Sequence, residues 1–224
     1  MSKQPFNELN LAAHVGDDPE HVNANLATVS GLLGLPRNRV VTMGAVHGAR
    51  IGFVSEPGHV EGVDALISTS SGLVLMALGA DCATIALSGP GIIGVVHCGW
   101  RGLVADVVGS TVAQMQSVSS GPLEAVVGPA ICGKCYPVSP ARISELVSAV
   151  SPRVSAAAIA SSRDGQPSID IRAGICERLS ELGVRMQVVG GCTVEDKALF
   201  SYRRDGVTGR QGMVIAFGAA DGQE

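Results

Sequence analysis

Short apolar runs, each closed by glycine, proline or a charged residue, constrain the fold of this 224-residue chain more than any other feature. The runs at Ala65–Ser68, Leu73–Ala77, Thr84–Leu87 and Ile92–His97 have the length of strands. Ser88-Gly89-Pro90-Gly91 supplies a turn between the last two runs. With 29 glycines and only 3% aromatic residues, the composition is typical of tight turns and closely packed β-structure. We therefore predict sheets at the centre of the fold.

Helical patterns separate these runs from further strands. An acidic cap and a proline at Asp17-Asp18-Pro19 mark a helix start. We predict helices over His21–Leu33, Leu103–Val118, Ala141–Val150 and Arg172–Leu182. Further strands are predicted at Val40–Val46, Arg50–Val54, Leu123–Val127, Ile169–Ile171, Met186–Val189 and Met213–Phe217, while the small, polar segment Ser155–Gln166 fits neither pattern. This mixture predicts an α/β (α+β) fold with mixed sheets, helices packed outside and a single domain over residues 1–224.

Composition excludes several classes of protein. Hydrophobic residues make up 46% of the chain and charged residues 16%, so we expect a sizeable core and no disorder. The net charge is −4 and no basic patch is present, which argues against nucleic acid. No apolar run has the length of a membrane span, and Met1 to Leu11 lacks the basic region and long apolar run of a signal peptide, so we expect a cytoplasmic protein without a membrane partner. Six cysteines then indicate reduced thiols, while nothing in the sequence indicates an oligomeric state.

Three residues that can bind a metal stand at the ends of predicted strands, namely His47, Cys82 and His97. Two imidazoles and one thiolate suit Zn²⁺, and copper is also compatible with them. Three protein ligands would leave a fourth position for water or substrate, as in catalytic zinc sites. The spacing matches no local metal motif, so two core histidines and a buried thiol form the alternative reading.

Three turn-rich segments are further candidates. Arg101 lies between glycines beside the only tryptophan of the chain, and Arg203, Arg204 and Arg210 surround a glycine-containing loop. Guanidinium groups bind phosphate or carboxylate in a bidentate manner, yet exposed loops are the simpler explanation of each segment alone. The pair Cys132-x-x-Cys135 is typical of redox motifs and zinc ribbons, but a ribbon needs a second such pair, which is absent. Two thiols near a loop are the simpler interpretation of that pair.

These segments together resemble the laccase-domain family, also called YfiH-like or multicopper polyphenol oxidase-like proteins and usually described as purine nucleoside phosphorylases. The matching motifs run in the family's order over nearly the whole chain: Asn10-Leu11, Gly16-Asp17-Asp18-Pro19, Val46-His47-Gly48, Asp64-Ala65, Ala80-Asp81-Cys82, His97-Cys98-Gly99-Trp100-Arg101-Gly102, Gly128-Pro129-Ala130-Ile131, Cys135-Tyr136-Pro137-Val138, Asp170-Ile171-Arg172, Cys192-Thr193, Ser201-Tyr202-Arg203-Arg204 and Thr208-Gly209-Arg210-Gln211. The resemblance implies an α-β-β-α layered arrangement with His47, Cys82 and His97 as metal ligands. It also implies metal-dependent phosphorolysis of adenosine, inosine, guanosine and methylthioadenosine, with an associated adenosine deaminase activity.

The chain departs from the family pattern at three positions near the matched motifs. Ala45 stands where the family has glutamine, Cys98 where it has alanine, and Pro137 where it has glutamate. The first and last changes remove polar groups near the expected pocket, so they bear on substrate preference more than on the metal.

Phosphorolysis needs a bound phosphate, and the arginines are the candidates to hold it. Arg101 comes first because it follows His97 closely, and Arg203, Arg204 and Arg210 complete the set. Asp81 is the carboxylate nearest to a metal ligand in sequence, and either proton transfer or the support of a turn explains it.

Three alternatives to the phosphorylase remain. A copper-dependent polyphenol oxidase of the multicopper type needs more histidines than the five present, since only His14, His21 and His59 lie outside the predicted ligand set. A cytosolic amidase acting on cell-wall precursors would also use a metal. A non-catalytic zinc-binding interaction protein is disfavoured because structural zinc usually has four protein ligands.

Overall fold

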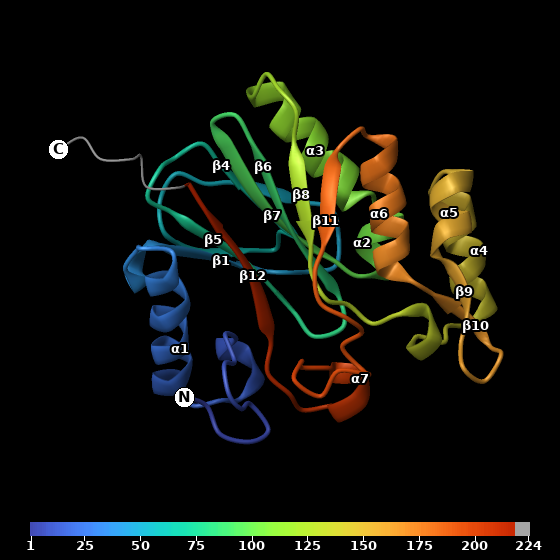
Figure 1. Cartoon of the computed structure of the whole chain (residues 1–224), viewed down its shortest axis with the longest axis horizontal. Helices are drawn as coiled ribbons and strands as arrows, with labels where there is room; N and C mark the ends of the chain where they lie inside the picture. Colours follow the sequence, from blue (N-terminus) through green and yellow to red (C-terminus); the bar gives the residue numbers. More distant parts are fainter. Residues whose placement is uncertain (218–224) are drawn as a thin grey trace.

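A computed structural model describes residues 1–217 as two mixed β-sheets packed between helices (Figure 1). The four-stranded sheet has the order β12-β5-β1-β3 and consists of β1 (Val40–Gly44), β3 (Gly58–Glu61), β5 (Val74–Gly79) and β12 (Gln211–Ala216). The six-stranded sheet has the order β11-β8-β6-β7-β4-β2 and consists of β2 (Ile51–Phe53), β4 (Ala65–Ser68), β6 (Ala83–Gly89), β7 (Ile92–Cys98), β8 (Glu124–Val127) and β11 (Arg185–Val188). The predicted fold class is confirmed.

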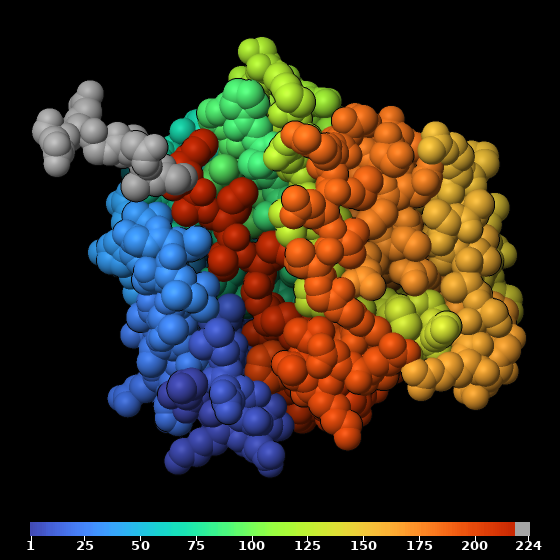
Figure 2. All heavy atoms as spheres, in the orientation of Figure 1, coloured from blue at the N-terminus to red at the C-terminus, as the bar shows by residue number. Residues whose placement is uncertain are grey.

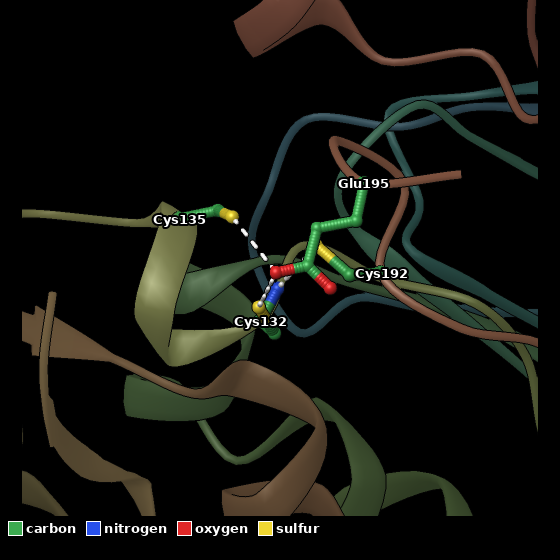
Figure 3. A group of neighbouring side chains, drawn as sticks. All are labelled: Cys132, Cys135, Cys192 and Glu195. Atoms are coloured by element: carbon green, nitrogen blue, oxygen red, sulfur yellow. Dashed lines mark hydrogen bonds between the residues drawn. The ribbon is translucent and has the colours of Figure 1, made fainter. Parts of the chain in front are cut away.

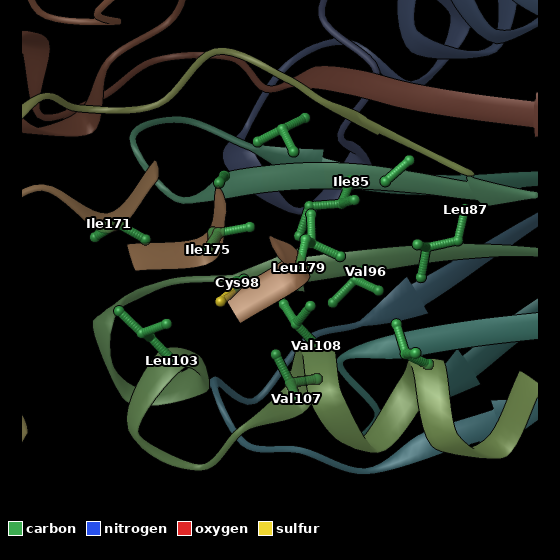
Figure 4. Packing of buried hydrophobic residues seen from close by; sticks show 14 of the residues in the cluster. Ile85, Leu87, Val96, Cys98, Leu103, Val107, Val108, Ile171, Ile175 and Leu179 are labelled. Atoms are coloured by element: carbon green, nitrogen blue, oxygen red, sulfur yellow. The ribbon is translucent and has the colours of Figure 1, made fainter. Parts of the chain in front are cut away.

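Helices cover the outer faces of both sheets. Helix α1 (Pro19–Leu32) packs on the four-stranded sheet through a cluster that includes Val22, Leu26 and Met76. On the six-stranded sheet lie α2 (Trp100–Val104), α3 (Val107–Val118) and α6 (Ile171–Glu181), with α4 (Pro140–Ala149) and α5 (Pro152–Ala158) beyond them. Figure 4 shows this second layer, where side chains of α3 and α6 meet those of the sheet. The layers are therefore α-β-β-α, as the family resemblance implied.

Strand β7 lies at the centre of the core and carries one of the candidate metal ligands. All seven of its residues are buried, because the sheet with β5 covers one face and α3 covers the other. Gly94 permits this close packing: a Cβ there would come within 3.2 Å of Ile67 and 3.1 Å of the Met115 sulfur. The strand is thus held firmly, and His97 near its end has little freedom to move.

One predicted helix is divided in two. The sequence predicts a single helix over Leu103–Val118, whereas α2 begins earlier and ends at Val104, and α3 starts at Val107. The break occurs because Asp106 adopts a left-handed conformation, with φ of 54°, and its carboxylate accepts a hydrogen bond from the Gly109 N–H. Asp106 also forms an ion pair with Arg178 of α6 at 2.6 Å. The residue at the break therefore links the start of α3 to α6.

Several short elements were not predicted. Strand β3 was not predicted because two of its side chains, His59 and Glu61, are polar and because it starts at a glycine, which is typical of a loop. The unassigned segment Ser155–Gln166 contains the end of α5 and strand β9 (Ile159–Ser161), which pairs with β10 (Pro167–Ile169). Asp170, expected in a strand, instead caps α6 by accepting a hydrogen bond from the Ala173 N–H. A short helix α7 (Tyr202–Asp205) and 3-10 turns at Ala13–Val15, Arg37–Arg39 and Gly133–Cys135 complete the structure.

The N-terminal segment lies beside the segment that leads into β12, as the adjoining blue and red surfaces of Figure 2 show. The Leu11 N–H donates to the carbonyl of Arg210, and the Arg210 N–H donates to the side-chain oxygen of buried Asn10. Within residues 1–217, no helix is both long enough and apolar enough to cross a bilayer. The prediction of a single domain over residues 1–224 extends beyond the described residues and stays a prediction.

Candidate metal centre and substrate cavity

The structure brings the three predicted metal ligands together from three separate segments. His47 lies in the loop after β1, Cys82 lies between β5 and β6, and His97 lies in β7. One nitrogen of each imidazole and the Cys82 sulfur all lie within 4.8 Å of one another. The two rings meet edge to face, with centroids 4.9 Å apart and planes at 88°. A single ion can therefore contact all three side chains.

A buried carboxylate fixes both histidines. One oxygen of Asp64 accepts from the His47 N–H at 2.7 Å and contacts the His97 Nδ1 at 3.1 Å, and the other oxygen accepts from the Gly48 N–H at 2.8 Å. These bonds hold His47 in a left-handed conformation with φ of 63°. A proton on His97 Nδ1, donated to Asp64, leaves the Nε2 lone pair of that ring for a metal.

Gly99 makes room for the cluster. A Cβ at this position would lie 2.7 Å from the Cys82 sulfur and 3.5 Å from Cδ2 of His47. A distance of 2.7 Å is well inside van der Waals contact, so any side chain there would displace the thiol. The glycine after Cys98 is therefore required by the metal ligands and not only by the turn into α2.

The charges of the cluster favour a thiolate. Burial raises the pKa of the Cys82 thiol, but hydrogen bonds with His47 and His97 outweigh burial and bring this pKa down to about 6. Burial lowers the pKa of His97, while hydrogen bonds with Asp64 and Cys82 outweigh it and raise this pKa to about 9. Without a metal, the thiolate and the imidazolium thus stabilise each other.

A cavity of about 1000 Å³ opens directly over this cluster. Its walls include all three ligands together with Asp81, Tyr136, Arg203 and Arg210. Pockets for small organic ligands have volumes of roughly 300–1000 Å³, so the space suffices for a nucleoside and an anion.

The predicted phosphate-binding arginines occupy different places. Arg203 and Arg210 line the cavity, and the Arg203 guanidinium lies 4.8 Å above the Tyr136 ring. Arg204 is engaged elsewhere: it pairs with Asp205 at 2.7 Å and donates to backbone carbonyls of the segment 193–199.

Arg101 lies apart from this group. Its exposed guanidinium stacks on Trp100 at 5.1 Å, and it is not among the residues that line the cavity. Arg101 is close to His97 in sequence, but it does not line the cavity with His97, because α2 starts at Trp100 and turns the chain away.

Asp81 anchors the segment that carries these arginines. Its carboxylate accepts hydrogen bonds at 2.6 Å from the hydroxyls of Thr193 and Ser201 and from the Arg203 N–H. Its φ of 96° places it in a strained conformation next to Cys82. Three donors already occupy this carboxylate, and they fix the position of Arg203 relative to the metal ligands.

The cavity also has a polar wall that the sequence analysis did not single out. His14, His59 and Glu61 line it, and His59 contacts both Thr42 at 2.8 Å and Glu61 at 3.2 Å. A signal was present in the sequence, because His59-Val60-Glu61 has the His-x-Glu spacing in which zinc deaminases carry their proton-transferring glutamate. His59, however, does not belong to the metal cluster. Gly44 gives the Glu61 carboxylate its place, since a Cβ at Gly44 would overlap it.

The comparisons with known proteins agree with this geometry. The family model described as multi-copper polyphenol oxidoreductase laccase matches residues 1–218. The chain belongs to this family. A purine nucleoside phosphorylase of Streptomyces coelicolor is 41% identical over 218 residues, which are 94% of this chain and 88% of that relative.

Two solved structures closely match this fold. A Bacillus licheniformis protein described as hypothetical protein YfiH gives a TM-score of 0.88 at 26% identity and covers 96% of this chain and 88% of its own. YlmD of Geobacillus stearothermophilus gives a TM-score of 0.87 at 33% identity and covers 96% of this chain and 87% of its own. The predicted fold and family are therefore confirmed.

The donor set of this family member fits a single zinc ion. Two imidazoles and a thiolate are typical ligands of Zn²⁺, and the carboxylate of Asp64 behind His97 is the arrangement that usually supports a metal-bound histidine. Within residues 1–217, no group of three or more histidines gathers as a cluster of several coppers would require. The residues thus fit one ion better than the several coppers in the family's description.

Two of the departures from the family pattern have visible consequences. Cys98 points into the core, where it lies among Leu103, Val107 and Ile175 and is fully buried (Figure 4). Burial raises the pKa of its thiol well above the usual value, so Cys98 packs as a hydrophobic residue and is no ligand. Ala45 lines the cavity with a methyl group, which is smaller and less polar than a glutamine side chain.

Proposed function

We propose that this protein is a metal-dependent purine nucleoside phosphorylase, which converts adenosine, inosine, guanosine or methylthioadenosine and phosphate into the free base and a ribose 1-phosphate. One observation carries the proposal: the cluster of His47, Cys82 and His97 lines the same cavity as the residues Arg203 and Arg210. The names of curated relatives such as the Streptomyces protein support it.

Arg203 and Arg210 are the residues that would hold phosphate. Both line the cavity, and both carry guanidinium groups that match phosphate oxygens in a bidentate manner. Backbone bonds from Arg210 Nη1 to the carbonyls of Thr208 and Gly209 leave its other nitrogens for an anion. Arg204 would act indirectly, because its bonds stabilise the loop in which Arg203 lies.

The opposite wall would receive the nucleoside. His14, His59 and Glu61 offer donors and acceptors for ribose hydroxyls or purine nitrogens, and the Tyr136 ring offers a flat apolar surface for the base. Ala45 in place of the family's usual glutamine removes one polar contact, so purine preference would depend on this wall.

A zinc ion held by His47, Cys82 and His97 would supply Lewis-acid polarisation of a substrate oxygen or nitrogen. The protein's own contribution is position: the ligands and Arg203 are fixed to one another through Asp81, which reaches from beside Cys82 to the Arg203 N–H. In this reading Asp81 orients the phosphate-binding loop, and a role in proton transfer would require it to give up one of its three donors.

Adenosine deamination is a second candidate activity, and Glu61 is the observation that favours it. Replacement of the purine amino group by water needs a carboxylate to move protons, and Glu61 lines the same cavity as the metal ligands. Glu61→Gln should therefore reduce deamination of adenosine more than phosphorolysis of inosine. Equal losses in both reactions would show that Glu61 binds substrate and transfers no proton.

The proposal is tested by incubating the purified protein with inosine and adenosine, with and without phosphate, while bound metal is measured. Phosphate-dependent release of hypoxanthine and adenine, lost together with one metal ion in Cys82→Ala, is the expected result. No turnover by a protein that holds zinc would reject the phosphorylase. The leading alternatives would then be an amidase acting on cell-wall precursors and a non-catalytic zinc-binding protein. Oxidation of a phenol by the copper-loaded protein would instead favour the polyphenol oxidase.

Arginine variants distinguish the phosphate site. Arg203→Ala should lower kcat/KM for phosphate about 10- to 100-fold, because a charge-assisted hydrogen bond is worth about 1.5–3 kcal/mol. Arg153→Ala is the matched control, since Arg153 is exposed and, within residues 1–217, forms an ion pair only with Glu177. Arg101→Ala is measured beside them. A larger loss of kcat/KM for phosphate in Arg101→Ala than in Arg203→Ala would show that Arg101 binds phosphate, as the sequence alone suggested.

A further inference from the structure

A second group of metal-binding side chains lies outside the cavity. Cys132, Cys135, Cys192 and Glu195 each offer one ligand atom, and these four atoms all lie within 4.8 Å of one another (Figure 3). Figure 3 shows the four side chains pointing toward a common centre from two loops. None of these residues contributes to the candidate active site, and the three cysteines are free.

The two loops have the same local design. The Cys135 N–H donates to the Cys132 carbonyl at 2.9 Å, so a tight turn presents both sulfurs on one side. In the second loop the Glu195 N–H donates to the Cys192 carbonyl at 3.2 Å, and the same spacing presents a sulfur and a carboxylate. A ribbon-type zinc site is made of two such turns. The second turn could not be recognised from the sequence as a Cys-x-x-Cys pair, because Glu195 stands where such a pair has its second cysteine.

The distances suit a tetrahedral ion. With metal–sulfur bonds of about 2.3 Å, the ligand atoms of a tetrahedral zinc site lie about 3.8 Å apart. The Glu195 Oε1 lies 4.0 Å from the Cys132 sulfur and 3.7 Å from the Cys135 sulfur. Little movement is needed to close the four atoms around one ion.

The surroundings also suit a metal-bound group. The Cys132 N–H donates to the Cys192 sulfur at 3.3 Å, which stabilises a thiolate. Arg163 contacts the Glu195 Oε1 at 2.6 Å and orients the carboxylate while it offsets part of the negative charge. Such supporting bonds to sulfur and carboxylate ligands are typical of the outer shell of metal sites.

We propose that Cys132, Cys135, Cys192 and Glu195 bind a structural Zn²⁺ ion, distinct from the ion of the candidate active site. Three thiolates select zinc over magnesium or calcium, and four protein ligands leave no position for a substrate. A disulfide is a poorer assignment because it would pair two of the three thiols and leave the third beside an unused carboxylate.

The ion would join the two segments that frame the cavity. Tyr136 follows Cys135 directly and lines the cavity under Arg203. Thr193 follows Cys192 and donates to Asp81. Binding of zinc would thus fix the separation between Tyr136 and the loop that carries Arg203, without contact to any substrate. The inference does not depend on the proposed phosphorylase activity.

The test is zinc content per chain, measured by plasma mass spectrometry on protein purified under reducing conditions. Cys132→Ser and Cys192→Ser should each lose one zinc per chain relative to wild type. The matched control Cys176→Ser, which changes a half-buried cysteine of α6 outside both clusters, should lose none. Combining Cys192→Ser with Cys82→Ala should remove both ions. A wild-type chain whose entire zinc is lost in Cys82→Ala alone would overturn the proposal.

A second measurement needs no variant and guards against misfolding of the serine variants. Wild-type protein in a phosphine reductant is alkylated with iodoacetamide, with and without a zinc chelator, and modified cysteines are identified by mass spectrometry. Cys132, Cys135 and Cys192 should be protected until the chelator is added, whereas Cys176 should react equally in both samples. Equal alkylation of all four without chelator, or a disulfide within the cluster of the native protein, would refute the structural zinc site.

Discussion

The substitution Asp64→Asn removes one charge from the support of the metal centre while it preserves the shape of the side chain. The carboxylate is fully buried and meets three donors: the His47 N–H, the Gly48 N–H and the His97 ring. An asparagine offers one acceptor oxygen and one amide group that only donates. Whichever way the amide is oriented, at least one of the three donors faces another donor.

The magnitude follows from this geometry. A buried N–H left without an acceptor costs about 1–3 kcal/mol, and the lost negative charge beside His97 adds to it, so we expect a loss of about 2–4 kcal/mol. In a domain of this size each kcal/mol shifts Tm by about 2–4 °C, which gives a fall of roughly 4–16 °C for the metal-free protein. Loss of the bond that orients a ligating histidine lowers metal affinity about 10- to 100-fold.

Two assays measure these effects. Thermal unfolding of the metal-free protein, followed by circular dichroism, gives the change in Tm, and competition with a chromophoric chelator gives the change in zinc affinity. Asp164→Asn serves as the matched control because Asp164 lies exposed in the turn between β9 and β10. Wild-type values for both Tm and zinc affinity in Asp64→Asn would refute the idea that this carboxylate organises the centre.

Three further results are expected. Gly99→Ala should abolish zinc binding at the cavity, because its Cβ would lie 2.7 Å from the Cys82 sulfur, whereas Gly31→Ala, whose Cβ meets nothing within 4 Å, should keep it; equal zinc contents would contradict this. Because the pKa of Cys82 is lowered to about 6, its thiolate stabilises the folded state, and this contribution is lost as pH falls through 6. Because the pKa of His97 is raised to about 9, its imidazolium also stabilises the folded state, and this contribution is lost as pH rises through 9. Metal-free wild type should therefore show its highest Tm between these values, and Cys82→Ser should flatten the profile; an unchanged profile would exclude the ion pair. Chelation should abolish phosphorolysis and added Zn²⁺ should restore it, and full activity of zinc-free protein would exclude metal dependence.

Much of the fold could be predicted from the sequence because its strands carry continuous apolar runs. The runs Ala65–Ser68 and Ile92–His97 correspond closely to β4 and β7, since both strands lie buried between layers and need apolar residues throughout. Strand β3 could not be found in this way. It lies at the edge of its sheet with exposed, polar side chains, and only the pairing with β1 gives it strand geometry.

The candidate site was predictable where chemistry restricts the residue type and not where geometry alone decides. His47, Cys82 and His97 could be proposed together because each stands at the end of a predicted strand and within a motif that resembles the family's. The distinction between Arg203, which lines the cavity, and Arg101, which does not, depends on where a helix turns the chain. The wall that contains Glu61 was equally hidden, because its position depends on Gly44, which lies 17 residues earlier in the chain, and on an edge strand that has no apolar pattern.

Segment 192–204 carries part of the second candidate metal site and is hydrogen-bonded to Asp81, which stands beside Cys82 of the first. Its start carries Cys192 and Glu195 of the second cluster, and its end presents Arg203 to the cavity. Asp81 binds both parts, through Thr193 and through the Arg203 N–H, although this requires Asp81 to adopt a positive φ of 96°. Such a conformation persists only where surrounding contacts determine it. A loop fixed at both ends would hold the guanidinium group of Arg203 at a set distance from Cys82, so that anion and metal act on one substrate without a large closing movement.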